Sequence, residues 1–276
     1  MIEKIGFMQG RLSNVIDGKI QAFPWLNWRA EILSAKSIGI SLMEWTLDQE
    51  RLHENPLMTD EGQKEIRALC EKYQFSILSV TGDCFMQAPF WKTDSLTICE
   101  MLKNDFETIV SSCNRIGIKI IIIPLVDGGS IENLDQENCL VEFFSKQESR
   151  CRKLGVKVAF ESDFSPMKLK SFISRFNADC YGINYDSGNS AALGFKQSEE
   201  FNAYGERILN VHIKDRTLNG GTVALGHGAV NFKNLFSLLN SIDYVGNYIL
   251  QTARAEDKQH VQLISKYKNF VLQELK

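Results

Sequence analysis

The sequence predicts a closed (β/α)8 barrel, in which eight parallel strands alternate with eight helices. Strand-like apolar runs alternate with amphipathic segments along the whole chain, at intervals of roughly 30 to 40 residues. The run at 119–124 is β-branched almost throughout, which is typical of a parallel strand that is buried on both faces. The length of 276 residues is close to that of a typical barrel, so we expect one domain over residues 1–276.

An open, doubly wound sheet is the main alternative fold. It would favour a glycine-rich phosphate turn directly after the first strand. The segment that follows this strand, Gly6-Phe7-Met8-Gln9-Gly10-Arg11, lacks the required glycine spacing. The closed barrel is therefore the better interpretation, since it also leaves no strand at an edge.

Capping residues set the bounds of the elements in the first half of the chain. Asp60 is a suitable helix N-cap, and Gly39, Gly117 and Gly155 each follow a helical segment. In chain order we expect a strand at 4–8, a helix at 25–37, a strand at 41–45, a helix from 59 or 60 to 73, a strand at 75–81, a helix at 95–116, a strand at 119–124 and a helix at 135–154.

The same alternation continues through the second half. Proline at a first helical position is favourable, so Ser165-Pro166 marks a helix start. We expect a strand at 157–161, a helix from 165, a strand at 180–186, a helix at 198–205, a strand at 209–213, a helix at 232–241, a strand at 248–251 and a helix at 256–275.

Composition argues against several classes of partner. A net charge of −3 gives no excess of the lysine and arginine that bind phosphate backbones, so we expect no nucleic acid partner. Residues 1–7 show no secretory signal, and the apolar run at 118–126 is too short to span a bilayer, so we expect no membrane partner. Seven scattered cysteines without a CxxC pair predict free thiols in the cytoplasm.

Four strand ends carry side chains that can bind a metal ion. Glu161, Asp186, His212 and Gln251 end strands five to eight. The carboxyl ends of barrel strands open at one mouth and neighbouring strands lie ~4.8 Å apart, so these side chains are expected to ring one ion. The two carboxylates balance a divalent charge. The set suits Mn²⁺, Mg²⁺, Co²⁺ or Zn²⁺, and we expect one such ion.

Each of these residues also has a simpler interpretation when it is taken alone. Asp186 could cap the following turn, and His212 could be a histidine of the core. A lone carboxylate such as Glu161 at the inner rim is costly without a partner. Their joint occurrence at consecutive strand ends favours the metal site.

The segments around these residues resemble the sugar phosphate isomerase/epimerase superfamily, which has a xylose isomerase-like barrel. The resemblance spans nearly the whole chain, and the segments 186–189 (Asp-x-Gly-Asn) and 212–215 (His-x-Lys-Asp) are most similar to ketopentulose 5-phosphate 3-epimerases. The segments that carry it are Gly6-Phe7-Met8-Gln9-Gly10-Arg11-Leu12, Glu44-Trp45, Phe160-Glu161, 185–190, 211–216 and 225–232.

The resemblance implies a mechanism and one departure from it. In that family Glu, Asp, His and a second Glu hold the metal, and the two glutamates flank the carbon that is inverted through a metal-stabilised cis-enediolate. The matching residues here are Glu161, Asp186, His212 and Gln251. Glu161 is then the general base, but an amide such as Gln251 cannot carry a proton. The missing acid could be Lys214, His227 or a water, or the activity is altered or lost.

Further side chains are expected at the same mouth. Lys214 shares the strand face of His212 and is expected to have a catalytic role, as a phosphate ligand or proton shuttle. Arg11 and Arg254 are candidates for binding an anion, and the backbone of Gly226-x-Gly228 is a candidate phosphate cradle. Trp45 either packs on a sugar or fills the barrel. The full set of expected substrate-binding residues is Gln9, Arg11, Glu44, Trp45, Asp83, Asn189, Arg216, His227 and Arg254.

The leading hypothesis is a metal-dependent aldose–ketose isomerase or ketose 3-epimerase that acts on a sugar or sugar phosphate. The alternatives are an inosose-type dehydratase, and a sugar-binding barrel without catalysis, which Gln251 motivates. An AP endonuclease shares the barrel but needs more histidines than the four in this chain. The resemblance also implies a homodimer or homotetramer.

Overall fold

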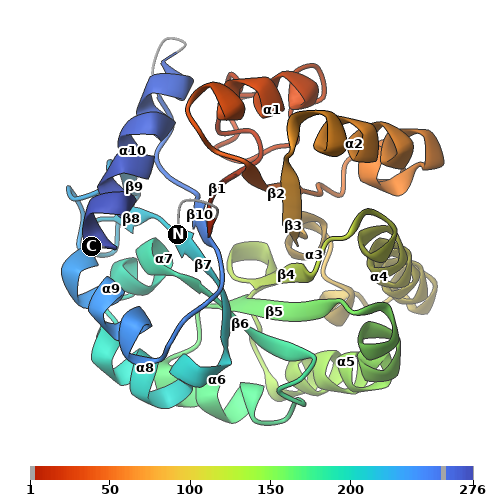
Figure 1. The fold of residues 1–276 in the computed structure, drawn as a ribbon. Coiled ribbons are helices and arrows are strands. Elements are labelled where there is room, and N and C mark those ends of the chain that lie inside the picture. Colours follow the sequence, from red (N-terminus) through yellow and green to blue (C-terminus); the bar gives the residue numbers. More distant parts are fainter. Residues whose placement is uncertain (1–3, 256–258, 276) are drawn as a thin grey trace.

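The computed structural model describes residues 4–255 and 259–275, and within them the predicted barrel is confirmed. Eight parallel strands close in the order β1-β10-β7-β6-β5-β4-β3-β2 (Figure 1). The strands are β1 (Ile5–Met8), β2 (Leu42–Thr46), β3 (Ser76–Thr81), β4 (Ile120–Leu125), β5 (Lys157–Ser162), β6 (Tyr181–Asp186), β7 (Ile208–Ile213) and β10 (Tyr248–Leu250).

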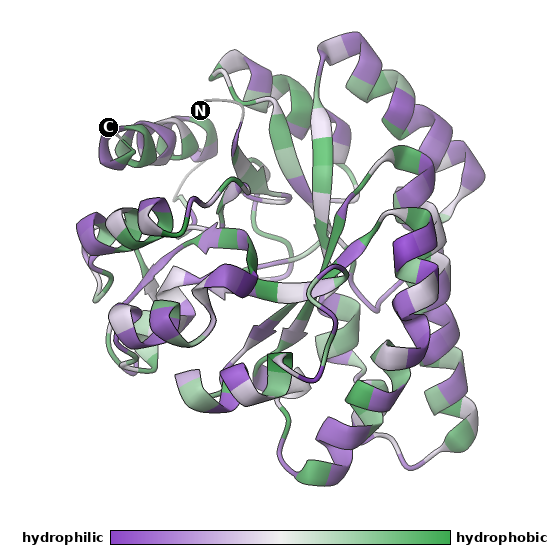
Figure 2. Ribbon diagram, turned by 60° about the horizontal axis from the view of Figure 1, so that its bottom comes forward, coloured by the Kyte–Doolittle hydropathy of each residue, from purple (hydrophilic) through white to green (hydrophobic). Residues whose placement is uncertain are grey.

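Helices surround these strands as an outer layer, and hydrophilic and hydrophobic residues form separate stripes along them (Figure 2). This pattern is typical of amphipathic helices that cover a barrel wall. The helices are α1 (Trp28–Ser37), α2 (Asp60–Tyr73), α3 (Asp83–Gln87), α4 (Leu96–Ile116), α5 (Leu134–Leu154), α6 (Pro166–Ile173), α7 (Ser187–Ala192), α8 (Gln197–Tyr204), α9 (Phe232–Ser241) and α10 (His260–Glu274).

Every predicted strand and helix is present, with shifts of one to three residues at some ends. The first helix begins at Trp28 instead of residue 25, because the segment from Pro24 forms a separate turn in which Asn27 N–H and Trp28 N–H both reach the Pro24 carbonyl. Thr59 is the N-cap of α2, because its hydroxyl accepts the Gly62 N–H at 3.1 Å; Asp60 lies in the first turn. The predicted start of the last helix, at Glu256, lies outside the described residues.

Three short elements at the mouth were not predicted. The helices α3 and α7 follow β3 and β6 directly, and the hairpin of β8 (Asp215–Arg216) and β9 (Thr222–Val223) follows β7. Each is too short to show a hydrophobic period of its own. All three lie in loops after barrel strands, where the functional groups of such barrels gather.

The main core fills the space between the barrel wall and the helices. Phe160 points outward from β5 and packs against Phe144 of α5, with ring centroids 5.2 Å apart. A second, small apolar cluster lies inside the barrel and consists of Met8, Leu42 and Ile249. The barrel interior is otherwise open to polar side chains, and this is where the candidate site lies.

The seven cysteines are free, as predicted. In the part of the chain that the structure describes, no helix combines the length and apolar character that crossing a membrane requires.

Candidate metal centre

Three of the four predicted metal ligands come together at the mouth of the barrel. Glu161, Asp186 and His212 each offer one ligand atom, and these atoms lie within 4.8 Å of one another. His212 Nδ1 is 3.2 Å from a Glu161 carboxylate oxygen and 4.0 Å from an Asp186 carboxylate oxygen. All three residues are buried.

Strand geometry explains why these side chains point inward. Because side chains alternate across a strand, the outward anchors Phe160 and Tyr185 place the next residues, Glu161 and Asp186, inside the barrel. Asp186 pairs in register with His212 on the neighbouring strand β7. Asp186 also caps α7, because its Oδ1 accepts the backbone N–H of Asn189 at 2.8 Å. The capping role and a metal-binding role are therefore compatible, since Oδ2 faces His212.

Glu44 lies beneath this cluster and contacts its histidine. Glu44 Oε1 is 2.7 Å from His212 Nε2, and Glu44 Oε2 accepts hydrogen bonds from Ser79 Oγ at 2.7 Å and Asn210 Nδ2 at 2.9 Å. Glu44 is fully buried. Its oxygens are therefore occupied by protein groups below the mouth, so this arrangement does not support the predicted contact between Glu44 and substrate.

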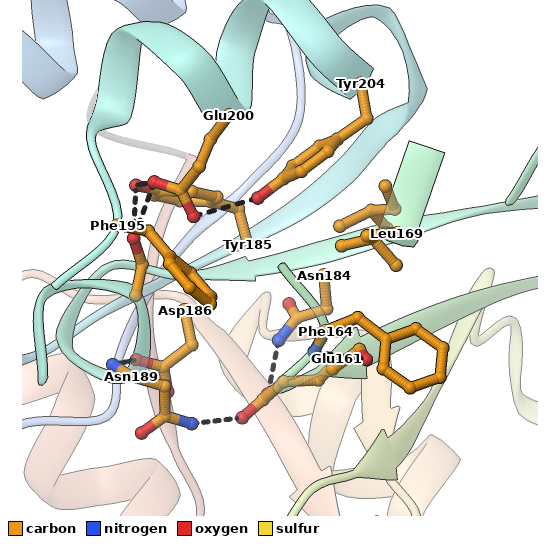
Figure 3. Close-up of a pocket in the computed structure, with 13 residues that line it drawn as sticks. Glu161, Phe164, Leu169, Asn184, Tyr185, Asp186, Asn189, Phe195, Glu200 and Tyr204 are labelled. Carbon is orange, nitrogen blue, oxygen red and sulfur yellow. Dashed lines mark hydrogen bonds between the residues drawn. The ribbon is translucent and has the colours of Figure 1, made fainter. Parts of the chain in front are cut away.

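Two asparagines fix the carboxylate of Glu161. Asn184 Nδ2 donates to Oε2 at 2.7 Å, and Asn189 Nδ2 donates to Oε1 at 2.7 Å (Figure 3). Asn189, a predicted substrate-binding residue, contacts both Glu161 and Lys214 and also lines the cavity described below. Asn184 was missed, because one polar residue inside an apolar strand gives no signal of its direction or partner.

Burial and charge act in opposite directions on the ionisable groups of this site. Burial lowers the pKa of His212, but the carboxylates of Glu44 and Glu161 outweigh it and raise that pKa to about 10. Burial raises the pKa of Asp186, and Glu161 adds to the effect although Lys214 opposes it. For Glu161, burial is outweighed by His212, Lys214 and Asn184, so its pKa is lowered and its carboxylate stays ionised.

Gln251 is linked to this cluster through Lys214. The Lys214 ammonium donates to Gln251 Oε1 at 3.3 Å, to Asn189 Oδ1 at 3.3 Å and to Asp186 Oδ2 at 3.4 Å. Gly188 permits this approach, because a Cβ there would lie 2.7 Å from Lys214 Cγ. The donor set of two carboxylates, one imidazole and a nearby amide fits a divalent cation.

A cavity of about 330 Å³ opens above the cluster, which is within the size range of small-molecule sites. Its wall joins the ends of strands from all sides of the barrel. The predicted site residues that line it are Arg11, Asp83, Glu161, Asn189, Lys214, Arg216 and Gln251.

Trp45 and Arg254, two other predicted substrate-binding residues, do not line the cavity. Trp45 is fully buried on the outer side of β2, where its ring packs against Trp28 with centroids 5.5 Å apart and its Nε1 donates to Asn55. Arg254 donates to the backbone carbonyls of Gly10 and Ser13. Both side chains support the mouth without lining the cavity.

Gln9 and His227 also lie away from the cavity wall. Gln9 is buried, and its Oε1 accepts the backbone N–H of Thr46 at 3.0 Å. His227 is exposed in the loop after β9.

The expected phosphate cradle around Gly226 and Gly228 is wrong as well. Both backbone N–H groups donate to Asp215 Oδ2, at 2.9 and 2.8 Å. Gly228 permits this contact, because a Cβ there would lie 2.2 Å from Asp215 Oδ1. These donors are therefore not available to a ligand.

A buried carboxylate behind the site was also missed. Glu200 of α8 accepts hydrogen bonds from Tyr185 at 2.9 Å, Ser190 at 2.6 Å and Tyr204 at 2.9 Å (Figure 3). Burial raises its pKa, and the three hydroxyl donors oppose that effect. The cluster joins α8 to β6 and α7, the elements that carry Asp186 and Asn189. A glutamate in a short amphipathic helix is usually solvated, so this buried position could not be predicted from the sequence.

Comparison with known proteins identifies the family to which this chain belongs. Residues 32–268 match the family model described as "Xylose isomerase-like TIM barrel". The chain belongs to this family. The predicted resemblance is thereby confirmed at the level of the barrel family, and the match covers most of the elements that build the mouth.

The known proteins to which this chain is similar are distant in sequence. A Haemophilus influenzae protein named for L-ribulose-5-phosphate 3-epimerase is 21% identical over 272 residues, which cover 91% of this chain and 92% of that protein. The solved D-allulose 3-epimerase from Methylomonas sp. is 15% identical with a TM-score of 0.76, over 99% and 98% of the two chains. A structure of the IOLI protein with a zinc atom is 16% identical with a TM-score of 0.75, over 99% and 98%. At these identities the structural likeness shows the fold.

Proposed function

We propose that this chain is a divalent-metal-dependent isomerase or epimerase of a sugar or sugar phosphate. The observation that carries the proposal is the position of Glu161, which belongs to the metal-binding cluster and also lines the cavity. The names of the relatives, an L-ribulose-5-phosphate 3-epimerase and a D-allulose 3-epimerase, support a ketose as substrate.

Glu161, Asp186, His212 and Gln251 would hold the ion. When bound, it would stabilise negative charge on the substrate oxygens beside the reacting carbon. The metal identity stays among Mn²⁺, Mg²⁺, Co²⁺ and Zn²⁺.

Glu161 would act as the general base. Its low pKa keeps the carboxylate ionised, and the amides of Asn184 and Asn189 fix its orientation. A base must be ionised and within reach of the proton that it removes. Glu161 would take the proton from the carbon next to the carbonyl, and that bonding pair would move toward the carbonyl oxygen.

Lys214 would return a proton on the second face. Gln251 cannot do this, because a side-chain amide does not act as an acid near neutral pH. The Lys214 ammonium is 3.3 Å from Gln251 Oε1 and lines the same cavity, so it can supply a proton where the family's second glutamate would stand. If Lys214 does not serve this face, Glu161 would deliver the proton to the neighbouring carbon on the same face while the hydroxyl proton moves to the former carbonyl oxygen, and the outcome would be isomerisation.

Solvent deuterium exchange tests the proposal. Ketoses and their phosphates are incubated with the Mn²⁺-loaded protein in D₂O and followed by proton NMR. We expect deuterium at C3 for an epimerase, or at C1 or C2 for an isomerase, and loss of exchange in Glu161→Gln. A dehydrated product would indicate the dehydratase. Absence of deuterium exchange into every sugar would overturn the proposal. We also place this activity in the cytoplasm. We expect the protein to form a homodimer or homotetramer, and light scattering can measure this oligomeric state.

A further inference from the structure

The turn that carries Arg11 is held by two charged side chains, one on its amides and one on its carbonyls. Glu31 of α1 accepts the backbone N–H groups of Gly10 and Leu12, each at 2.9 Å. Arg254 donates to the carbonyls of Gly10 and Ser13. Gly10 has a φ of 91°, a conformation that side chains other than glycine rarely adopt. The backbone on both sides of Arg11 is thus fixed.

Arg11 itself is a buried cation with only neutral partners. Its side chain reaches the cavity wall although the residue is only 3% exposed. Nη1 donates to the carbonyl of Ile20 at 2.6 Å and to Gln21 Oε1 at 2.7 Å, and Nε has no acceptor. Among residues 4–255 and 259–275, no carboxylate oxygen lies within 4.0 Å of the guanidinium.

A buried guanidinium without a directly paired anion is costly, and the hydrogen bonds to Ile20 and Gln21 hold it at the cavity wall. Burial and the nearby Arg254 lower the pKa of Arg11 to about 9, although the more distant carboxylates of Asp83, Glu31 and Asp186 oppose them, so the group stays charged at neutral pH. Because Nη1 already donates twice and Nε is enclosed, Nη2 is the nitrogen left to give a phosphate oxygen a charge-assisted hydrogen bond. Arg216 and Lys214 line the same cavity and add positive charge, against the carboxylates of Asp83, Asp127 and Glu161 in its wall.

We propose that Arg11 binds the phosphate group of the substrate and so restricts the enzyme to sugar phosphates. This inference rests on the proposed function and narrows its substrate class. The phosphate would fill the missing anionic position beside Arg11, while the sugar carbons extend toward Glu161.

Equilibrium binding to the Mn²⁺-loaded protein tests this assignment. The probes are a ketopentose 5-phosphate, the same ketopentose without phosphate, and inorganic phosphate, measured by calorimetry. We expect Arg11→Gln to weaken binding of both phosphate-containing probes by about 30-fold or more and binding of the free sugar by less than about 3-fold, as expected for loss of a charge-assisted pair. The affinities of Arg11→Lys should lie between these values, since lysine keeps the charge but loses the planar guanidinium.

The matched control is Arg150→Gln on the outer face of α5, where Arg150 pairs with Glu107. It should leave all three affinities unchanged. If Arg11→Gln unfolds, Arg11→Lys and the wild-type preference between the two sugars decide the question. Equal losses for both sugars, or a wild type that does not prefer the phosphate, would overturn the assignment.

Deuterium exchange separates this proposal from the proposed function. Exchange into both sugars at equal rates, unaffected by Arg11→Gln, would overturn the role of Arg11 and leave the isomerase proposal standing. Phosphate binding that depends on Arg11, without exchange into any sugar, would overturn the isomerase proposal and leave the role of Arg11 standing.

Discussion

The carboxylate of Glu44 lies 2.7 Å from Nε2 of His212, and both side chains are fully buried inside the barrel. Because the Glu44 carboxylate accepts a hydrogen bond there, the proton of the imidazole stays on Nε2. The other nitrogen, Nδ1, then faces Glu161 and Asp186. Such a carboxylate–histidine pair orients a metal ligand and raises its basicity.

Glu44→Gln should therefore weaken metal binding. We expect the Kd for Mn²⁺ or Zn²⁺ to rise by about 10- to 100-fold, the range found when a ligand-orienting partner is lost. Calorimetric titration of the metal-free protein measures this directly. Ser79→Ala is the control, because it removes another hydrogen bond to Glu44 and leaves the His212 contact in place. An unchanged Kd in Glu44→Gln would show that His212 is not held by this pair.

Metal binding should release protons. The pKa of His212 is raised to about 10 in the metal-free protein, so the imidazole is protonated at neutral pH and must lose a proton to bind an ion. The apparent affinity should then rise with pH from 6 toward 9. Calorimetry in two buffers of different ionisation enthalpy counts the protons, and we expect about one at pH 7. A binding enthalpy that is independent of the buffer would contradict this account.

Much of this site follows from the positions of strand ends, and this explains what could be predicted. Glu161, Asp186 and His212 each follow a clear apolar strand, so their convergence follows from the barrel itself. Alternation along β2 predicts that Glu44 and Trp45 face opposite sides, but the sequence could not show which of them faces inward or that both are closed to solvent. The second-layer contacts from Asn184 and Asn210 depend on register shifts, such as the one between Ile183 and Asn184, which no hydrophobic period reveals.

Gln251→Glu should raise epimerisation if the amide limits the second proton transfer. A carboxyl group would restore a proton carrier beside Lys214, and we expect exchange at C3 to increase by about 100-fold, the lower end of what one acid–base group contributes. Proton NMR in D₂O measures the rate. Gln259→Glu, an exposed change at the start of α10, controls for added charge. Unchanged exchange would mean that Lys214 already serves this face.

Asp83 should make the metal-free protein less stable as pH rises. Burial, with added repulsion from Asp48 and Glu161, raises the pKa of Asp83 from 3.8 to about 7. A carboxyl group with a raised pKa keeps its proton in the folded state after the unfolded chain has lost it. Its contribution is therefore complete below about pH 4 and is lost as pH rises toward 7.

Asp83→Asn removes this titration while keeping the shape of the side chain. At pH 4 the variant and wild type should have similar free energies of unfolding, and at pH 8 the variant should be more stable by about 1–4 kcal/mol. Urea unfolding of the metal-free proteins at both pH values measures the difference.

Glu31, whose pKa is also raised to about 7 by burial, is common to both proteins and cancels in this comparison. Asp135→Asn, at an exposed position of α5, is the control. A wild type that loses no stability relative to Asp83→Asn between pH 4 and 8 would show that Asp83 is ionised in the cavity throughout, and that its charge is balanced there by a cation such as Arg11.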